Sequence, residues 1–326
     1  MRFTPLFLLL LLLAGCSQLA DHGPVSARTQ ARMEALVLTK EEFLKRVQSP
    51  RMKPAGPVTV AFQLKAGVPV IDVTINGGKK LPMMVDTGAS RTMIHATTAV
   101  AKQVSLLSAV DATVEMQGVI GSEKGRIGLL DSLEVGGWTL GGYPCLVRTF
   151  QNHTADTGFP DCLMGFDVAL EHCSYLTFDY RNKKITFGFG GSFSSPVGKR
   201  AAFAPFKVKH GVPFITLEAG GKSWEAIVDT GSFNGVEISE EVAKKLGVQN
   251  QGVEVKGLYL MAVGGTVSSG QVKMRTVRLP ELKFFGDRYR DVDIDIAPGP
   301  PRVGSHFLKD YRVTFDIRRK RLWLEW

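Results

Sequence analysis

Two segments of the chain, far apart in the sequence, repeat the same order of features. "LKAGVPVIDVTINGG" (64–78) corresponds to "VKHGVPFITLEAGG" (208–221), and each leads into an Asp-Thr-Gly, at 86–88 and at 229–231. The alternation of apolar and polar residues between glycines is typical of β-hairpins. A repeat of about 140 residues is too long for a solenoid unit. The sequence therefore predicts two homologous lobes, each of the size of a small domain.

The later parts of the two copies match as well. Each has a short helical stretch, "TTAVAKQVSLL" and "SEEVAKKLGV", and each closes on a glycine followed by a Phe-Asp strand. Short strands with glycine turns and few helices indicate an all-β fold. A Gly/Ser-rich segment, "GFGGSFSSPVGKR", separates the copies and has the composition of a flexible linker. We expect a first lobe over 56–190, a hinge over 191–201 and a second lobe over 202–326.

The first sixteen residues, "MRFTPLFLLLLLLAGC", indicate a signal peptide. Arg2 precedes an apolar run from Leu6 to Leu13 that is too short to span a bilayer. The run ends in Leu-Ala-Gly-Cys, which resembles the lipobox of bacterial lipoproteins, and that resemblance implies cleavage before Cys16 and lipidation of its thiol. Ser17 then implies sorting to the outer membrane, facing the periplasm. The alternative is a plain secretory signal in which Cys16 is incidental.

The segment 17–55 is polar and basic, and it carries one helical signal in "LTKEEFLKRVQSP". Thr39 can cap this helix, Glu42 can complete a capping box, and Pro50 can end it. We expect a tether with a short helix. A pro-segment that covers the functional site is the alternative.

Three further cysteines, Cys145, Cys162 and Cys173, follow the signal. In an oxidising compartment two of them can form one disulfide, and the sequence does not say which two. No Cys/His spacing indicates a metal site, and there is no phosphate-binding or dinucleotide-binding motif, so we expect no metal and no cofactor. The net charge of +9 comes from scattered basic residues without a nucleic-acid-binding signature, so we expect no nucleic-acid partner.

The two Asp-Thr-Gly segments suggest one shared site. The residues that follow them differ (Ala89-Ser90 against Ser232-Phe233), whereas Asp-Thr-Gly itself is identical. Two carboxyls a few ångströms apart cannot both ionise cheaply, so they share a proton. One can then activate a water as a base while the other protonates a carbonyl as an acid. Glycine permits close approach of the two loops, so each copy supplies half of one active site.

From about residue 58 to 326 the sequence resembles a two-lobed aspartic peptidase of the pepsin and retropepsin clan. The resemblance rests on both Asp-Thr-Gly loops, on Leu163-Met164-Gly165 with its partner Val303-Gly304, and on the two Phe-Asp strands. It implies pepsin/retropepsin-like β lobes with the active site between them. It also implies a catalytic dyad, a cross-lobe pair of threonines and loop glycines at these positions: Asp86, Asp229, Thr87, Thr230, Gly88 and Gly231.

The chain departs from the family pattern at Arg302, where the family usually has an apolar residue. A buried unpaired guanidinium is costly, so either the second lobe is more open there or Arg302 has an acidic partner.

The flap tyrosine of pepsins has no clear counterpart in this chain. Two glycine-bearing hairpins stand instead at equivalent places in the two copies, "MQGVIGSEKG" (116–125) and "MAVGGTVSSG" (261–270), and they resemble retropepsin flaps. A surface hairpin without a gating role is the alternative for the second. The flap residues that we expect over the cleft are Gly118, Val119, Ile120, Gly121, Val263, Gly264 and Gly265.

The residue after each Asp-Thr-Gly also differs from the family pattern. Pepsins usually have a hydroxyl there in both lobes, and it bonds the outer carboxylate oxygen. This chain has Ala89 in one lobe and Ser232 in the other, so only Ser232 can support its aspartate in this way. The loss of one such bond should raise the pKa values of the dyad above those of pepsin. We expect activity that extends to mildly acidic or near-neutral pH.

The function that the sequence favours is an endopeptidase, anchored by lipid in the bacterial envelope, that hydrolyses an extended polypeptide substrate. We expect a monomer, because one chain holds both halves of the site. The alternative is a peptide-binding or scaffold lipoprotein that keeps the fold without turnover. Two complete Asp-Thr-Gly loops argue against that alternative, because a binding module has no need of two converging carboxyls.

Overall fold

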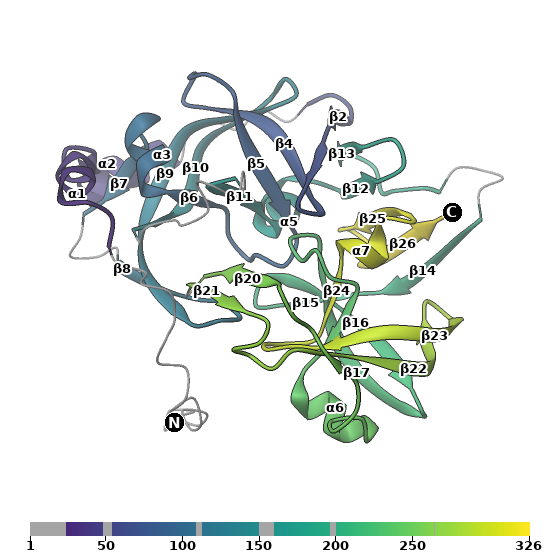
Figure 1. Ribbon diagram of the computed structural model, residues 1–326. Coiled ribbons are helices and arrows are strands. Elements are labelled where there is room, and N and C mark those ends of the chain that lie inside the picture. Colours follow the sequence, from purple (N-terminus) through teal and green to yellow (C-terminus); the bar gives the residue numbers. More distant parts are fainter. Residues whose placement is uncertain (1–23, 48–53, 109–112, 150–159, 196–199, 264) are drawn as a thin grey trace, which may run out of the picture.

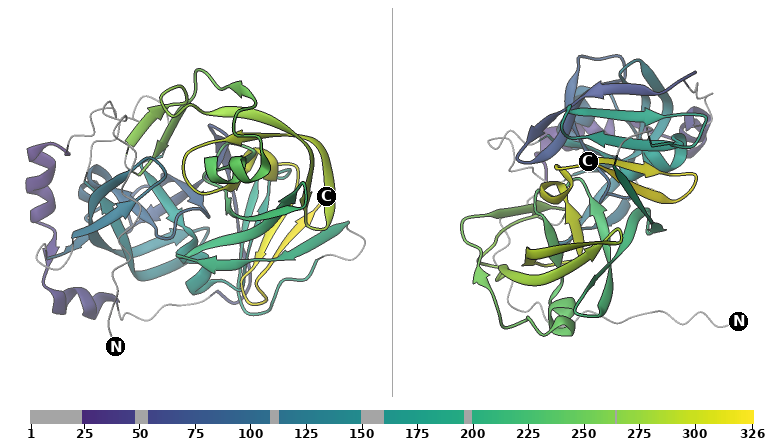
Figure 2. Two further views of the ribbon diagram at one scale, coloured as in Figure 1. Left: turned by 90° about the horizontal axis from the view of Figure 1, so that it is seen from below. Right: turned by 90° about the vertical axis from the view of Figure 1, so that its right-hand side faces the viewer.

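The computed structural model describes residues 24–47, 54–108, 113–149, 160–195, 200–263 and 265–326. Two β lobes lie one above the other in Figure 1, with the first lobe in blue and the second in green. Figure 2 shows the same two layers from the side, with the C-terminus between them. The all-β, two-lobed prediction is confirmed.

A ten-stranded sheet forms most of the first lobe. From one edge to the other its strands are β1 (Val37–Leu38), β7 (Ser105–Leu107), β9 (Ser122–Val135), β10 (Trp138–Arg148), β6 (Met93–His95), β11 (Cys162–Gly165), β5 (Leu81–Asp86), β4 (Val68–Ile75) and β3 (Gln63–Lys65), with β8 (Thr113–Gln117) paired to β9. Helix α3 (Ala96–Ala101) follows β6, and helix α5 (Phe166–His172) follows β11.

The second lobe repeats this plan in an eight-stranded sheet. Its strands are, in order, β15 (Lys207–Lys209), β16 (Val212–Ala219), β17 (Lys222–Asp229), β24 (Arg302–Gly304), β18 (Val236–Ile238), β23 (Asp287–Ile296), β22 (Arg275–Phe284) and β19 (Val253–Glu254). Helix α6 (Glu240–Leu246) follows β18, and helix α7 (Ser305–Leu308) follows β24. Strands β20 (Tyr259–Ala262) and β21 (Gly265–Ser268) form a separate hairpin.

The register of the strands shows that the two copies are structural repeats. In the first lobe β11 runs parallel to β5, with Gly165 opposite Asp86. In the second lobe β24 runs parallel to β17, with Gly304 opposite Asp229. Each aspartate therefore ends a strand at the same place in its lobe, beside the glycine that the sequence repeat had paired with it.

A six-stranded sheet joins the lobes and takes strands from both. Its order is β14 (Ala201–Pro205), β26 (Arg321–Glu325), β25 (Arg312–Asp316), β12 (Tyr175–Asp179), β13 (Lys184–Gly188) and β2 (Val58–Ala61). The two Phe-Asp strands, β12 and β25, pair antiparallel at its centre. Thr177 lies opposite Thr314 there, and their hydroxyls are 2.8 Å apart.

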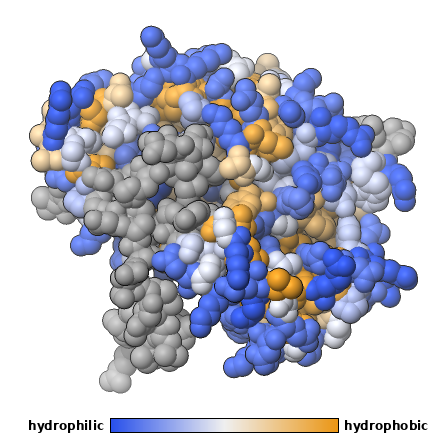
Figure 3. Space-filling view, viewed as in Figure 1, coloured by the Kyte–Doolittle hydropathy of each residue, from blue (hydrophilic) through white to orange (hydrophobic). Residues whose placement is uncertain are grey.

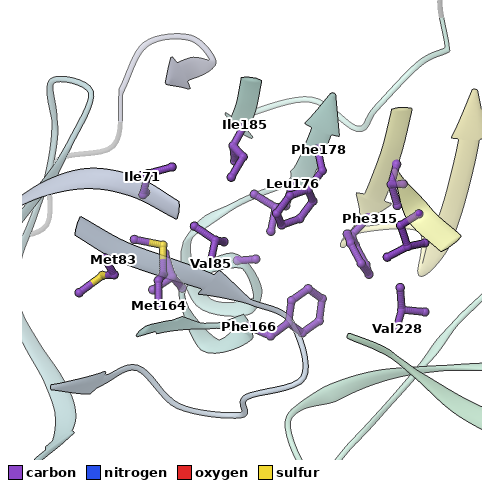
Figure 4. Packing of buried hydrophobic residues seen from close by; sticks show 14 of the residues in the cluster. Ile71, Met83, Val85, Met164, Phe166, Leu176, Phe178, Ile185, Val228 and Phe315 are labelled. Atoms are coloured by element: carbon purple, nitrogen blue, oxygen red, sulfur yellow. The ribbon is translucent and has the colours of Figure 1, made fainter. Parts of the chain in front are cut away.

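One hydrophobic core continues from lobe to lobe through this sheet. Phe178 and Phe315 pack edge to face across the two central strands, with ring centroids 6.2 Å apart. Phe166, at the start of α5, packs against Phe315 at 5.3 Å. Figure 4 shows these rings between Val85 of the first lobe and Val228 of the second. The strands that end at the two aspartates are thus anchored in the same core.

The segment before the first lobe is folded, which differs from the expected tether. It forms α1 (Ala27–Glu34), β1 and α2 (Lys40–Val47), and β1 pairs in parallel with β7. Val25, Met33 and Phe43 are buried, so burial of these apolar side chains holds residues 24–47 on the outer side of the lobe (Figure 1). The capping box is as predicted, because the Thr39 and Glu42 side chains each accept the other's backbone N–H. Pro50 lies outside the described residues.

The expected hinge is also partly packed. Phe193 is buried and its ring lies 5.5 Å from Tyr175 and 5.9 Å from Trp323, on the sheet that joins the lobes. The hydroxyl of Ser195 donates to Glu325. Residues 196–199 of the expected hinge lie outside the described residues.

The structure contains none of the disulfides that the three cysteines allowed. Cys145 and Cys162 are buried free thiols, and every possible pair among the three includes at least one of them. Burial raises the pKa of the Cys162 thiol to about 11, which keeps it protonated at neutral pH. Among the described residues, no helix has the length and apolar character needed to cross a bilayer.

We predict that Phe43→Ala lowers the free energy of unfolding by about 3 kcal/mol, because it leaves a cavity where α2 packs on the lobe. Leu44 is the matched control, since it is the next residue of the same helix and is 48% exposed. Leu44→Ala should cost less than about 1 kcal/mol. Urea unfolding of both variants, without residues 1–16, measures the difference. Equal values would mean that α2 does not pack on the lobe.

Candidate active site

The two aspartates end buried strands and begin tight loops. In β5 the residues before Asp86, Met83 and Val85, are buried in the core, and in β17 Val228 occupies the same position before Asp229. Strand β11 or β24 lies alongside each of them. This packing fixes the start of each loop, so the carboxyl groups point out of the sheets into the space between the lobes.

The threonines of the two loops lock the lobes together. The backbone N–H of Thr87 donates to the Thr230 hydroxyl oxygen at 3.0 Å, and the Thr230 N–H donates to that of Thr87 at 3.0 Å. Each hydroxyl in turn donates across the junction, from Thr87 to the carbonyl of Val228 at 2.6 Å and from Thr230 to that of Val85 at 2.7 Å. Both side chains are buried. These four reciprocal hydrogen bonds are therefore shielded from water.

The loop glycines bring each backbone against the opposite carboxyl. A Cβ on Gly88 would overlap the carboxyl group of Asp229, and a Cβ on Gly231 would overlap that of Asp86. No side chain fits in either place without moving the dyad. The glycines of the motif are therefore required by the close approach of the two loops.

The carboxyl groups of Asp86 and Asp229 meet at this junction and share a hydrogen bond. Oδ1 of Asp86 accepts the N–H of Gly88 at 2.8 Å, and Oδ1 of Asp229 accepts those of Gly231 at 2.9 Å and Ser232 at 3.1 Å. Burial raises the pKa of Asp86 well above its usual range, and the neighbouring charge of Asp229 raises it further. Burial also raises the pKa of Asp229, but the Arg302 cation opposes that rise.

Arg302 has an acidic partner, which settles the two alternatives that its position left open. Its Nε donates to Oε2 of Glu237 at 2.7 Å and its Nη2 to Oε1 at 3.0 Å. Arg302 is 5% exposed and Glu237 is 1% exposed, so the pair is buried. The guanidinium Nε also lies 4.0 Å from Oδ2 of Asp229. Sequence reasoning did not identify Glu237, although the need of a buried arginine for a carboxylate was a signal that one existed.

Ser232 supports Asp229 in a different way from the one expected. Its backbone N–H, not its hydroxyl, bonds the aspartate. The hydroxyl donates to Oε2 of Glu237 at 3.1 Å and accepts the N–H of Asn234. The outer oxygen of Asp229 therefore faces the guanidinium of Arg302 in place of a hydroxyl.

Both glycine-bearing hairpins reach the space over the dyad. The first is formed by β8 and β9, and its turn closes with the N–H of Gly118 donating to the carbonyl of Gly121 at 2.8 Å. Gly118 and Val119 line the cleft, as does Val263 of the second hairpin. Gly118 lies against Val263, since a Cβ there would be 2.8 Å from the Val263 Cβ. Of the other expected residues, Gly265 begins β21 and Gly264 lies outside the described residues.

Each hairpin tip packs on the opposite lobe. Ile120 of the first hairpin contacts the small apolar cluster around Leu260 and Phe233 in the second lobe. Val263 of the second hairpin packs with Ala89 and Met93 in the first lobe. The hairpins therefore cross above the aspartates.

The cleft beneath the hairpins has a volume of about 1190 Å³ and contains both aspartates. On the face shown in Figure 3, hydrophilic residues cover much of the surface, with hydrophobic patches between them. No set of three or more His, Cys, Asp or Glu side chains in the described residues is grouped so that it could hold a metal ion. A half-buried pair of carboxyls that shares one proton can act as acid and base on a group placed between the lobes.

Comparison with known proteins agrees with this geometry. A family model described as aspartyl protease matches residues 71–168 and 215–306, one match in each lobe and more than half of the chain in total. A search of curated proteins gave no significant match.

Among solved structures, the aspartic proteinase from Irpex lacteus is similar in fold, with a TM-score of 0.54 and 15% sequence identity. The match covers 82% of this chain and 97% of that one, and at this identity the likeness concerns the fold alone. The repeated family match and the paired Asp-Thr-Gly loops lead to one conclusion, which is that the chain belongs to the aspartyl protease family.

Proposed function

We propose that the protein is an aspartic endopeptidase that hydrolyses peptide bonds of an extended polypeptide bound between the lobes. The observation that carries this proposal is that the Asp86 and Asp229 carboxyls are hydrogen-bonded to each other. The loop backbone opposite each carboxyl lies so close to it that only glycine fits there. The aspartyl protease family of the chain supports the same reaction class.

The reaction needs one protonated and one ionised carboxyl. The carboxylate takes a proton from a water, whose oxygen bonds to the carbonyl carbon of the scissile amide, while the carboxyl gives its proton to the carbonyl oxygen. A neutral gem-diol results. The C–N bond then breaks as the newly protonated aspartic acid gives its proton to the leaving nitrogen, and a gem-diol hydroxyl returns a proton to the other aspartate. Both aspartates end in their starting states.

The cleft suits an extended peptide. Its volume of about 1190 Å³ exceeds the roughly 300–1,000 Å³ of sites for small ligands, and apolar side chains line it on both sides of the dyad. The edges of the two hairpins offer backbone groups that can bond an extended main chain. The crossed hairpins would have to separate to admit a substrate and could then close over it.

The second candidate is a peptide-binding or scaffold protein without turnover. The same apolar cleft and hairpins favour it, because they would hold an extended segment whether or not the dyad reacts. The complete glycine and threonine arrangement around both aspartates favours the peptidase, since peptide binding alone does not need a shared proton.

For the location, we propose a lipid anchor at Cys16 that holds the enzyme in the bacterial envelope, at the periplasmic face of the outer membrane. The support is the Leu-Ala-Gly-Cys-Ser sequence after a short apolar run. A diacylated or triacylated cysteine gives durable membrane binding because several chains bury their methylenes together.

We predict that Asp86→Asn and Asp229→Asn each lower kcat/KM for a cleaved peptide by at least about 10³-fold, because neither variant retains an acid and a base in the dyad. The test uses the protein without residues 1–16 and a peptide library read by mass spectrometry. Asp72→Asn, at an exposed position of β4, is the matched control and should cleave as the parent does. Cleavage by both dyad variants at the parent's rate would refute the peptidase.

We predict a bell-shaped pH profile that extends to mildly acidic or near-neutral pH, because burial raises the pKa values of both carboxyls. The raised pKa of Asp86 also affects folding. A carboxyl whose pKa is higher in the folded state stabilises most below its unfolded pKa of about 4, and that stabilisation is lost as pH rises through the folded pKa.

Asp86→Asn cannot ionise, so its melting temperature should rise relative to the parent's as the pH increases from about 4 to 7. Calorimetry across this range tests the sign. A relative fall, or an activity maximum near about pH 2, would contradict the raised pKa.

We predict that Cys16→Ser abolishes incorporation of labelled palmitate and the release of the protein's signal peptide, because the acyl chain is carried by the thiol. Ser17→Ala should keep the label. Fractionation of inner and outer membranes then locates the parent. Palmitate label in Cys16→Ser, or a mature N-terminus elsewhere, would show that the anchor is not at this cysteine.

A further inference from the structure

The two lobes differ at one pair of equivalent positions beside the dyad. In the first lobe, Leu163 of β11 lies opposite Met93 of β6. At the same register in the second lobe, Arg302 of β24 lies opposite Glu237 of β18. An apolar pair in one repeat is thus a buried ion pair in the other.

This difference gives the two aspartates unlike surroundings. On the side of Asp86 the cleft is lined by an apolar cluster of Ala89, Met93 and Met116, with Leu163 packed against it. The outer oxygen of Asp229 faces a guanidinium nitrogen at 4.0 Å, while its inner oxygen accepts two loop N–H groups. A negative charge is therefore stabilised on Asp229 and opposed on Asp86.

We propose that Arg302 and Glu237 are a positioning pair that fixes the negative charge of the dyad on Asp229 and the shared proton on Asp86. The proposal rests on the proposed peptidase function, in which it gives the two aspartates different roles. Asp229 is the base that takes the proton from water, and Asp86 is the acid that protonates the substrate carbonyl. The pair acts through the aspartates and does not itself touch the reacting atoms.

Glu237 makes it possible for an arginine to be buried here. Its carboxylate accepts two bonds from Arg302, one from the Ser232 hydroxyl and one from the Asn234 amide at 2.7 Å. These four bonds satisfy both oxygens and hold the guanidinium in one orientation. The geometry places the cation, not the anion, next to Asp229, so the pair acts on the dyad as an oriented dipole with its positive end inward.

Other charged or titratable groups stand farther from the dyad or around the pair. The Tyr180 hydroxyl bonds Ser305 behind the Asp229 loop, and its pKa is raised by burial, so it is neutral at working pH. Asp295 of β23 lies beside Glu237 in register and accepts the Thr276 hydroxyl. His306 lies near Asp295. In the first lobe, Asp167 of α5 accepts the backbone N–H of Thr92. The other charged or titratable residues that line the described part of the cleft are Arg91, Glu115, Arg148, Asp161 and His210.

The most direct test gives the second lobe the two residues that the first lobe has at these positions. The double variant Glu237→Met/Arg302→Leu replaces the ion pair by the residues that the first lobe has at the same positions, so the site stays filled. Without the cation, ionisation of Asp229 becomes harder. The acidic limb of the kcat/KM profile should then move up by about one pH unit, since an opposite charge at this range shifts a carboxyl pKa by about one to three units and Glu237 partly offsets it.

Glu237→Gln tests the same proposal with the opposite sign. It removes the anion and keeps the cation, so the acidic limb should move to lower pH. The exposed pair Arg278 and Asp293 is the control, because Arg278→Leu/Asp293→Met removes an ion pair of the same type away from the cleft and should leave both limbs in place. Melting temperatures show that each variant is folded.

A measurement that needs no catalysis tests the distribution of charge in the dyad independently of the proposed peptidase activity. In protein labelled with ¹³C at aspartate carboxyls, NMR titration follows both groups, assigned with Asp86→Asn and Asp229→Asn. In the parent we expect Asp229 to ionise about one pH unit or more below Asp86, and in the double variant we expect the two titrations to approach each other. Folded variants whose carboxyls titrate as in the parent would overturn the proposal, whether or not a substrate has been found.

Discussion

The structure depends on one constraint, which is that two largely desolvated carboxyl groups must be held together at the base of the cleft between the lobes. Left to themselves, Asp86 and Asp229 would repel each other once ionised, and each loses solvation by burial. The reciprocal bonds of Thr87 and Thr230 oppose that separation, because opening the junction would leave buried donors and acceptors without partners. The core that runs through the shared sheet anchors the strands behind both loops.

Much of this arrangement was predictable from the sequence because it is repeated. Two Asp-Thr-Gly loops at equivalent places, each with a later glycine and a Phe-Asp strand, indicated two lobes with a common site, and the strand registers place those residues side by side. The alternatives left open at Arg302 were resolved by Glu237, which stands far from Arg302 in sequence and becomes its neighbour only when β18 and β24 pair.

Other features escaped prediction because they depend on tertiary packing. The segment before the first lobe reads as a polar tether, yet its few apolar residues, Met33 and Phe43 among them, face the lobe and are buried there. The Ser232 hydroxyl was expected to bond Asp229, but it donates to Glu237 instead. Both departures arise where a partner distant in sequence outweighs a local pattern.

The repeat also explains how one fold can hold an asymmetric site. Identical loops bring the aspartates together, while the residues beneath them differ, apolar in the first lobe and ionic in the second. The central claim is that the paired carboxyls hold one hydrogen between them. Neutron diffraction from a perdeuterated crystal at mildly acidic pH tests it most directly. We predict a single deuterium on Asp86 that points to Asp229. Two well-separated carboxyls, or a deuterium on neither, would contradict the shared proton.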